Sequence, residues 1–363
     1  MSRIKGLLQN ALLLVLSVLL GIVLVESAWR FVPKRSDVYQ WSNRYMLFSD
    51  DAGDTVFRNI GAFFVYQPHR LVHSTAYYYA GSRWVKEYDY SFHTNNFGLV
   101  QLADVDPSRD ALLVLGDSFT EGQGAAPWFE DIRAGSEYQL VNGGLFGTGF
   151  AQWALLHDYL VKHNTRIKKL LVIFISDDFD RFVSNVPADV LSCIANWKTC
   201  DGSEGLYGEP PRAEERPAFL DKLKSLREQR LRANDDLSKR MLPATSLAIE
   251  YLLAVIKERG PANRGYTPSN LENYKVIGRF LTSYGRNVVF VHLPQKDELK
   301  FGISASGAAA RQAISAQGGL VFDGFERCGL TQADYHPHDG HPNRAGYAKI
   351  AQCVSDALRP GPS

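Results

Sequence analysis

Residues 111–124 read ALLVLGDSFTEGQG, an apolar run followed by a glycine-containing turn. A run of this length is typical of a strand buried on both faces of a parallel sheet. Ser118 would then stand at the carboxyl end of the strand, just before a helix, with its hydroxyl exposed and its backbone N–H available to a developing oxyanion. A lone GDS string also fits a helix N-cap serine that follows a turn glycine, so other parts of the chain must decide between the two.

Four further apolar runs repeat the strand pattern, and segments with helical periodicity lie between them. We expect strands at 138–144, 169–176, 287–294 and 319–324, and helices at 150–163 and 271–285. Short buried strands that alternate with helices predict an α/β fold with a parallel five-stranded sheet, covered on both faces, and functional residues at the carboxyl ends of the strands. The interval between the third and fourth strands is too long for one crossover. It predicts an insertion at about 180–268 with a charged, solvent-facing helix.

The C-terminal part, residues 334–353, reads DYHPHDGHPNRAGYAKIAQC. Asp339 and His341 are two residues apart, so in extended backbone their side chains point to the same side. The carboxylate can then hold the imidazole while its other nitrogen faces a serine. The rival interpretation is a metal site made of His336, His338 and His341 with the neighbouring acids, but the serine motif favours the catalytic pair. We interpret His292, on an expected strand, as structural.

Composition places the chain among folded proteins that do not bind nucleic acid. It has 363 residues, 45% of them hydrophobic, and a net charge of +1, which excludes a disordered chain and a global basic field. The 20 residues of segment 6–25 carry no charge and are long enough to span a bilayer as a helix. We expect a membrane anchor in residues 1–30. The alternative is a cleaved signal peptide. Glu26 argues against it, because this acid occupies a position where a cleavage site has small residues.

The cysteines bear on topology. They fall into two local pairs, Cys193 with Cys200 and Cys328 with Cys353, and none has a CxxC metal spacing. Two disulfides fit an oxidising compartment, with four free thiols as the alternative. We therefore expect the body of the chain to lie outside the cytoplasm. We expect this body to consist of an aromatic-rich β lead-in at 31–107 and a catalytic domain at 108–360.

Three stretches in order, GDSFTEG at 116–122, NGGLFGTG at 142–149 and DGHPNRAGY at 339–347, together resemble the SGNH (GDSL-type) hydrolase superfamily. The resemblance implies a three-layer, flavodoxin-like sheet with no cofactor. It implies Ser118 as nucleophile, His341 as base and Asp339 as its partner. The backbone N–H groups of Ser118 and Gly147 would form the oxyanion hole. Site support is expected from three further residues: Asp117, Asn142 and Gly144.

Two positions depart from the family pattern. An asparagine that donates to the oxyanion is expected after the third strand, and Asp177 stands there. An ionised carboxylate cannot donate and would repel the developing charge. The acid is also two residues before the histidine rather than three, which resembles the membrane-linked SGNH O-acetyltransferases that act on exopolysaccharides. Pro294, Gln295 and Lys296 are similar to a Pro-x-Lys stretch that such proteins often carry.

The sequence therefore predicts an enzyme of the cytoplasmic membrane with its catalytic domain on the periplasmic side. It would be a serine esterase or O-acetyltransferase that acts on ester-linked acyl groups of a carbohydrate, anchored in the lipid bilayer and accompanied by polysaccharide-modification proteins. The alternative is a catalytically weak domain that binds carbohydrate or helps to assemble such a system. Asp177 favours the alternative.

Overall fold

The computed structural model describes residues 13, 17, 20–27, 43–53, 55–125, 128–132, 137–186, 211–239 and 270–359. Residues 20–27 are helical, and most of the expected membrane segment 6–25 lies outside the described residues. Within the described part, no helix has both the length and the apolar character needed to cross a membrane. The expected Cys193–Cys200 pair also lies outside the described residues.

The chain divides into two compact units, which are described separately. One joins Met1–Asn43 to Leu220–Arg264, and within it the Arg227 guanidinium donates to the Asn43 side chain at 2.8 Å. The other joins Arg44–Phe219 to Gly265–Ser363 and holds every strand found among the described residues. Helix α6 (Arg216–Lys239), which was expected as a charged helix, begins in the second unit and continues into the first.

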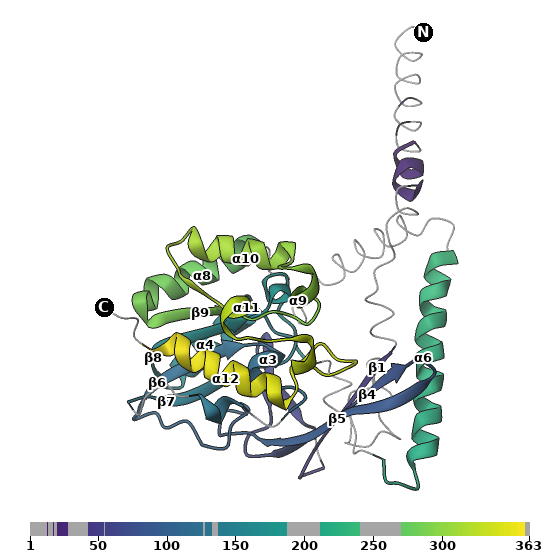
Figure 1. The fold of residues 1–363 in the computed structure, drawn as a ribbon, viewed down its shortest axis with the longest axis horizontal. Helices are drawn as coiled ribbons and strands as arrows, with labels where there is room; N and C mark the ends of the chain where they lie inside the picture. Colours follow the sequence, from purple (N-terminus) through teal and green to yellow (C-terminus); the bar gives the residue numbers. More distant parts are fainter. Residues whose placement is uncertain are drawn as a thin grey trace, which may run out of the picture. The chain divides into compact units, whose positions relative to one another are not determined.

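A five-stranded parallel sheet forms the centre of the larger unit, with the strand order β10-β9-β8-β6-β7 (Figure 1). Its strands are β6 (Asp110–Gly116), β7 (Gln139–Gly144), β8 (Arg166–Phe174), β9 (Val288–His292) and β10 (Val321–Asp323). Counted along the chain, this order is 2-1-3-4-5, the flavodoxin-like arrangement. The predicted α/β fold and its five strands are confirmed.

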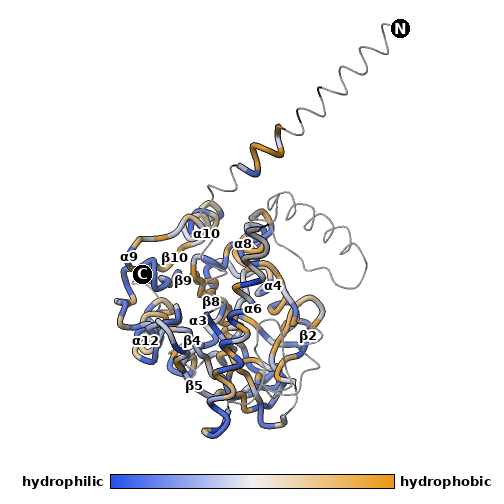
Figure 2. Tube along the Cα trace, turned by 90° about the vertical axis from the view of Figure 1, so that its right-hand side faces the viewer, coloured by the Kyte–Doolittle hydropathy of each residue, from blue (hydrophilic) through white to orange (hydrophobic). Residues whose placement is uncertain are grey.

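Helices cover both faces of this sheet because alternate residues of each strand point to opposite sides. Leu113 and Leu115 of β6 belong to a core that is shared with α4 (Phe150–Lys162), α8 (Asn270–Tyr284) and α10 (Ala305–Ser315). Leu112 and Val114 belong to a second core under α12 (Arg344–Leu358). Strand β9 and the second half of β8, residues 170–174, are correspondingly hydrophobic (Figure 2).

Short helices connect these elements at the two edges of the sheet. They are α3 (Ser118–Glu121), η1 (Phe129–Asp131), η2 (Ser176–Phe179), η3 (Gly285–Asn287), α9 (Glu298–Phe301), α11 (Gly324–Arg327) and η4 (Gln332–Asp334). Several begin with a side-chain cap. Asp117 accepts from the Phe119 N–H at the start of α3, and Asp323 accepts from the Phe325 N–H at the start of α11. The long helix α12 is capped in the same way by Asn343, which accepts from two N–H groups.

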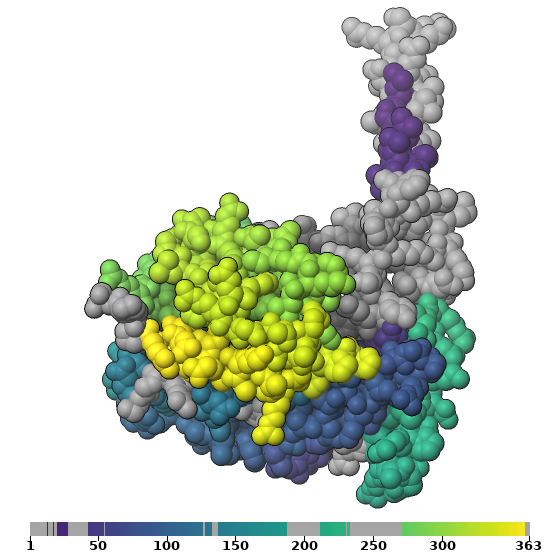
Figure 3. Space-filling view, viewed as in Figure 1, coloured from purple at the N-terminus to yellow at the C-terminus, as the bar shows by residue number. Residues whose placement is uncertain are grey.

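The aromatic-rich lead-in folds as strands, as predicted. β1 (Arg44–Asp50), β4 (Leu71–Ala80) and β5 (Arg83–His93) form an antiparallel sheet, and β2 (Phe57–Ile60) pairs with β3 (Phe63–Tyr66). The β4–β5 ladder is interrupted because Tyr77 pairs with Lys86 while Ala76 pairs with Tyr88, which leaves Glu87 as an extra residue. Figure 3 shows the C-terminal segment, in yellow, against these strands, in blue.

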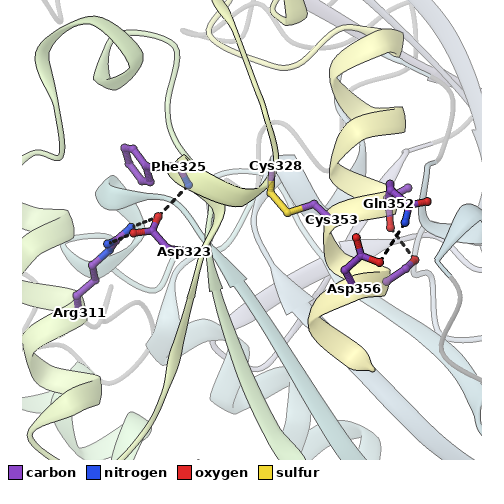
Figure 4. Close-up of a disulfide and its surroundings, with 9 residues drawn as sticks. Arg311, Asp323, Phe325, Cys328, Gln352, Cys353 and Asp356 are labelled. Atoms are coloured by element: carbon purple, nitrogen blue, oxygen red, sulfur yellow. Dashed lines mark hydrogen bonds and ion pairs between the residues drawn. A yellow bond between two sulfur atoms is a disulfide. The ribbon is translucent and has the colours of Figure 1, made fainter. Parts of the chain in front are cut away.

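A disulfide joins Cys328 to Cys353, as expected (Figure 4). It links the end of α11 to α12, and the segment between them contains Asp339 and His341. Disulfides persist in oxidising compartments and are rare in the cytoplasm. The bond is therefore typical of a domain that lies outside the cytoplasm.

Candidate active site

Three side chains from distant parts of the chain form one hydrogen-bonded series at the carboxyl edge of the parallel sheet. The Ser118 Oγ lies 2.8 Å from the His341 Nε2, and the His341 Nδ1 lies 2.5 Å from the Asp339 Oδ1. Ser118 follows β6, whereas the other two residues lie in the loop before α12. In this strand order, β6 and β8 flank the point where the chain reverses direction across the sheet, which is where ligands bind in such folds.

The Asp339 carboxylate holds the imidazole in one orientation. Besides the contact to the ring, its Oδ1 accepts from the His341 backbone N–H at 3.1 Å. Burial opposes the ionisation of Asp339, but the imidazole of His341, the Arg44 guanidinium and the Tyr78 hydroxyl together hold the pKa of that carboxyl well below its usual range. An ionised Asp339 can only accept, so the His341 Nδ1 donates to it and the Nε2 is free to accept the Ser118 proton.

Asp117 and Arg181 fix the turn that carries Ser118. The Asp117 Oδ1 accepts from the Phe119 N–H at 2.8 Å, and its Oδ2 accepts from Arg181 at 2.8 Å. The same guanidinium pairs with Asp178 at 2.7 Å and donates to the Thr148 carbonyl at 3.1 Å. Arg181 therefore ties together the turns after β6, β7 and β8. Burial raises the pKa of Asp178, although Arg181 opposes the rise.

The loop after β7 lies beside this turn, because Gly116 and Gly144 are paired across the two strands. The Asn142 side chain donates to the Val100 carbonyl at 2.7 Å and accepts from the Gly144 N–H at 2.9 Å, so it shapes the loop from below. A Cβ on Gly144 would lie 2.3 Å from the Glu121 nitrogen, so only glycine fits. Gly147 has a φ of +70°, and its N–H makes no hydrogen bond to another described group.

Asp177 lies in η2, which follows β8, the third strand of the parallel sheet along the chain, and its side chain is exposed. Its Oδ2 accepts from the Gln295 side chain at 2.9 Å. Among the described residues no hydrogen bond joins Asp177 to Ser118 or His341. The buried acid of this turn is Asp178, which accepts from the Ile175 N–H at 2.8 Å.

The two histidines that precede Asp339 contact different partners and do not converge on one point. His336 lies 2.9 Å from the Gly124 carbonyl, and His338 pairs with Glu87 at 2.8 Å. Lys296 of the predicted Pro-x-Lys stretch donates to the carbonyls of His336 and Pro337 at 2.6 and 2.8 Å, so it holds this loop. No group of three metal-ligating side chains occurs in the described part of the chain.

His292 makes the contacts of a buried structural residue, as interpreted from the sequence. Its Nδ1 accepts from the Arg311 Nε at 2.7 Å, and its Nε2 lies 3.1 Å from the Ser176 Oγ. Arg311 also holds Asp323 through two nitrogens at 2.7 and 2.9 Å (Figure 4). Burial, followed by the charge of Arg311, lowers the pKa of His292 to about 3, so the ring stays neutral.

Nothing in the sequence pattern predicts that the lead-in reaches the site. The Tyr78 hydroxyl of β4 donates to the Asp339 Oδ2 at 2.7 Å, and the Tyr66 hydroxyl of β3 donates to Glu121 of α3 at 2.8 Å. Glu121 also accepts from the Phe146 N–H at 2.6 Å, one residue before Gly147. Alternating aromatics predict strands, but they do not show which element those strands face.

Comparisons with known proteins are few and distant. No family model matches the chain, and no curated protein matches it in sequence. A carbohydrate acetylesterase family member from Sinorhizobium meliloti is 13% identical, with 69% of this chain and 97% of that chain covered and a TM-score of 0.29. The protein YxiM from Bacillus subtilis is 13% identical, with 87% and 77% covered and a TM-score of 0.36.

A third solved structure, a gut microbial diltiazem-metabolizing enzyme, is 12% identical with a TM-score of 0.31. The match covers 69% of this chain but only 47% of that one. Identities and TM-scores this low carry no inference about activity. The function proposed below therefore rests on the site itself.

Proposed function

We propose that this protein is an SGNH-type serine enzyme that transfers acyl groups from esters, either to water or to a sugar hydroxyl. The observation that carries the proposal is the series Ser118, His341 and Asp339 with contacts of 2.8 and 2.5 Å. A serine, a histidine with one fixed tautomer and a buried carboxylate in this order form the arrangement that activates a serine hydroxyl.

In the proposed reaction, the Ser118 Oγ attacks the ester carbonyl carbon while its proton passes to the His341 Nε2. The backbone N–H groups of Ser118 and Gly147 donate to the oxyanion, and Arg181 holds the two turns that carry them. The C–O bond to the alcohol then breaks, and His341 returns the proton to the leaving oxygen. Water or a sugar hydroxyl next attacks the acyl-enzyme, again losing its proton to His341, and Ser118 is restored.

We further propose an acetylated carbohydrate as substrate and an N-terminal membrane anchor, with the catalytic unit on the periplasmic side. The uncharged segment 6–25 supports the anchor, and the Cys328–Cys353 disulfide supports a location outside the cytoplasm. A polysaccharide-modifying system at the membrane would supply the substrate and the partner proteins.

Hydrolysis of p-nitrophenyl acetate tests the chemistry. We expect Ser118→Ala to lose both turnover and labelling by a fluorophosphonate probe, whereas Ser108→Ala, at an exposed position before β6, keeps both. Undiminished turnover by Ser118→Ala would refute the mechanism. Product analysis with an acetylated oligosaccharide, in the presence and absence of an unacetylated acceptor, separates an esterase from a transferase.

The second candidate is a carbohydrate-binding or assembly domain with little activity. Asp177 favours it, because an acid stands where the family places a donor to the oxyanion. Measurable binding of an oligosaccharide, with no labelling of Ser118, would support this second function over the first.

A further inference from the structure

The antiparallel sheet of β1, β4 and β5 lies directly against the loop that carries Asp339 and His341 (Figure 3). β4 reaches Asp339 through Tyr78, and β5 reaches His338 through Glu87. The ring of Tyr88, also on β5, packs on the ring of His336 with centroids 5.3 Å apart. The loop is therefore held from the side of the sheet along most of its length.

Tyr78 completes the hydrogen bonding of the Asp339 carboxylate. Its hydroxyl donates to Oδ2 at 2.7 Å, while Oδ1 accepts from the ring and the backbone of His341. Asp339 is 4% exposed and Tyr78 is 9% exposed, so solvent does not provide a substitute donor. With both oxygens engaged from opposite sides, the carboxylate has one orientation.

Arg44 supports the contact between Tyr78 and Asp339 through its charge. Arg44 and Tyr78 are directly opposite each other on β1 and β4, and the Arg44 charge helps to lower the pKa of Asp339. The carboxylate is therefore ionised and can only accept, so the Tyr78 proton turns to Asp339. The positive charge of Arg44 also balances the buried negative charge of Asp339, which would otherwise be costly.

The irregularity in β5 brings two consecutive residues to the same loop. In a regular strand, neighbouring side chains point to opposite faces. Here Glu87 accepts from the His338 N–H at 2.6 Å, while the next residue, Tyr88, packs on His336 and accepts from the Gln123 side chain at 2.7 Å. Bulges occur next to active sites because they redirect side chains in this way.

We propose that Tyr78 is a positioning residue for Asp339, and that the antiparallel sheet is thereby part of the active site. The hydrogen-bonded series then runs from Tyr78 through Asp339 and His341 to Ser118, and the charge of Arg44 acts on Asp339. The expected effect on kcat rests on the proposed serine chemistry. The effect of Tyr78 on the bond between Asp339 and His341 does not, and it can be measured in a protein that turns over no ester.

Tyr78→Phe removes only the hydroxyl and keeps the ring that packs in the core. Tyr79→Phe, the next residue on β4, is the matched control and should behave as the wild type. For Tyr78→Phe we expect kcat for p-nitrophenyl acetate to fall about 10- to 100-fold, the range for losing a hydrogen bond to a charged group, with KM changed less than about twofold. Fluorophosphonate titration corrects kcat for the active fraction.

The second readout is the downfield proton resonance of the His341 Nδ1–H in the NMR spectrum, assigned by its loss in His341→Gln. It reports the bond to Asp339 whether or not the protein turns over an ester. We expect the resonance in the wild type and in Tyr79→Phe, and its shift or loss in Tyr78→Phe. Arg44→Lys keeps a positive charge, so it should retain part of the kcat and part of the His341 resonance. This variant replaces Tyr78→Phe in both measurements if Tyr78→Phe does not fold.

The outcomes separate the two proposals. Wild-type values of kcat and an unchanged resonance in Tyr78→Phe would overturn the positioning role, as would a lower kcat explained entirely by a lower active fraction. Absence of the resonance in the wild type would also overturn it. A wild type that neither hydrolyses esters nor labels, but shows a resonance that depends on Tyr78, would refute the proposed function and support the positioning role.

Discussion

Glu121 offers a test of how the buried charges of the site are balanced. It is 2% exposed in α3, where its carboxyl contacts the Tyr66 hydroxyl and the Phe146 N–H. Burial outweighs both of these donors and raises the pKa of Glu121 from 4.5 to about 8. At neutral pH the folded protein therefore keeps a proton on Glu121 that the unfolded chain has released.

The sign of the effect follows from this difference in bound protons. Because the folded state binds the extra proton, the stability that Glu121 contributes is complete below pH 4.5 and is lost as the pH rises towards 8. The full difference corresponds to about 5 kcal/mol, of which about 3 to 4 kcal/mol falls between pH 5 and pH 8. Glu121→Gln resembles the protonated acid, cannot ionise and should not show this loss.

The measurement is the free energy of unfolding in urea at pH 5 and pH 8, with the disulfide intact. We expect the free energy of unfolding of the wild type, taken relative to that of Glu121→Gln, to fall by about 3 to 4 kcal/mol between pH 5 and pH 8. Glu326→Gln, at an exposed position of α11, is the control and should follow the wild type. A difference between wild type and Glu121→Gln that stays constant across this range would refute the reasoning.

Three further changes test the fold and the site. Replacing Cys328 and Cys353 together by serine opens a cross-link between residues 25 positions apart, so the free energy of unfolding should fall by about 3.5 kcal/mol; an unchanged urea midpoint would contradict this. Gly144→Ala should destabilise the protein by about 1–3 kcal/mol in the same assay, because its Cβ would meet the Glu121 nitrogen at 2.3 Å, and wild-type stability would show that β7 and α3 separate easily. Asp177→Asn should change kcat by less than about twofold, since its exposed side chain contacts Gln295, and a large gain in kcat would show that the carboxylate acts on the oxyanion.

Much of the parallel sheet could be predicted because its strands are buried on both faces and read as apolar runs. The run at 111–116 became β6, and the run at 169–176 became β8 with its start shifted to Arg166. The juxtaposition of Ser118 with His341 was expected from their motifs and is observed, whereas their catalytic roles stay predictions. A sequence motif of this kind records which residues must meet, so it is informative over long separations.

The surroundings of Asp339 could not be predicted in the same way. Tyr78 lies in a run of three tyrosines, and nothing in the alternation distinguishes the one that meets a carboxylate from its neighbours. Arg44 reads as a surface cation beside an aromatic segment, yet it is half-buried and stands opposite Tyr78 through the pairing of β1 with β4. Such contacts depend on how a sheet and a loop pack together, which local periodicity does not encode.

Glu87 bears on how the antiparallel sheet and the C-terminal loop that carries His338 depend on each other. If this one residue were deleted, every existing β4–β5 pair could remain, with Tyr88 still opposite Ala76, so the ladder itself has no need of it. The deletion would remove the contacts that the Glu87 carboxylate makes with the backbone N–H and the Nδ1 of His338. The strand is thus one residue longer than its sheet requires. A graft of this sheet onto another chain, or of the C-terminal loop onto another sheet, would have to carry both partners together.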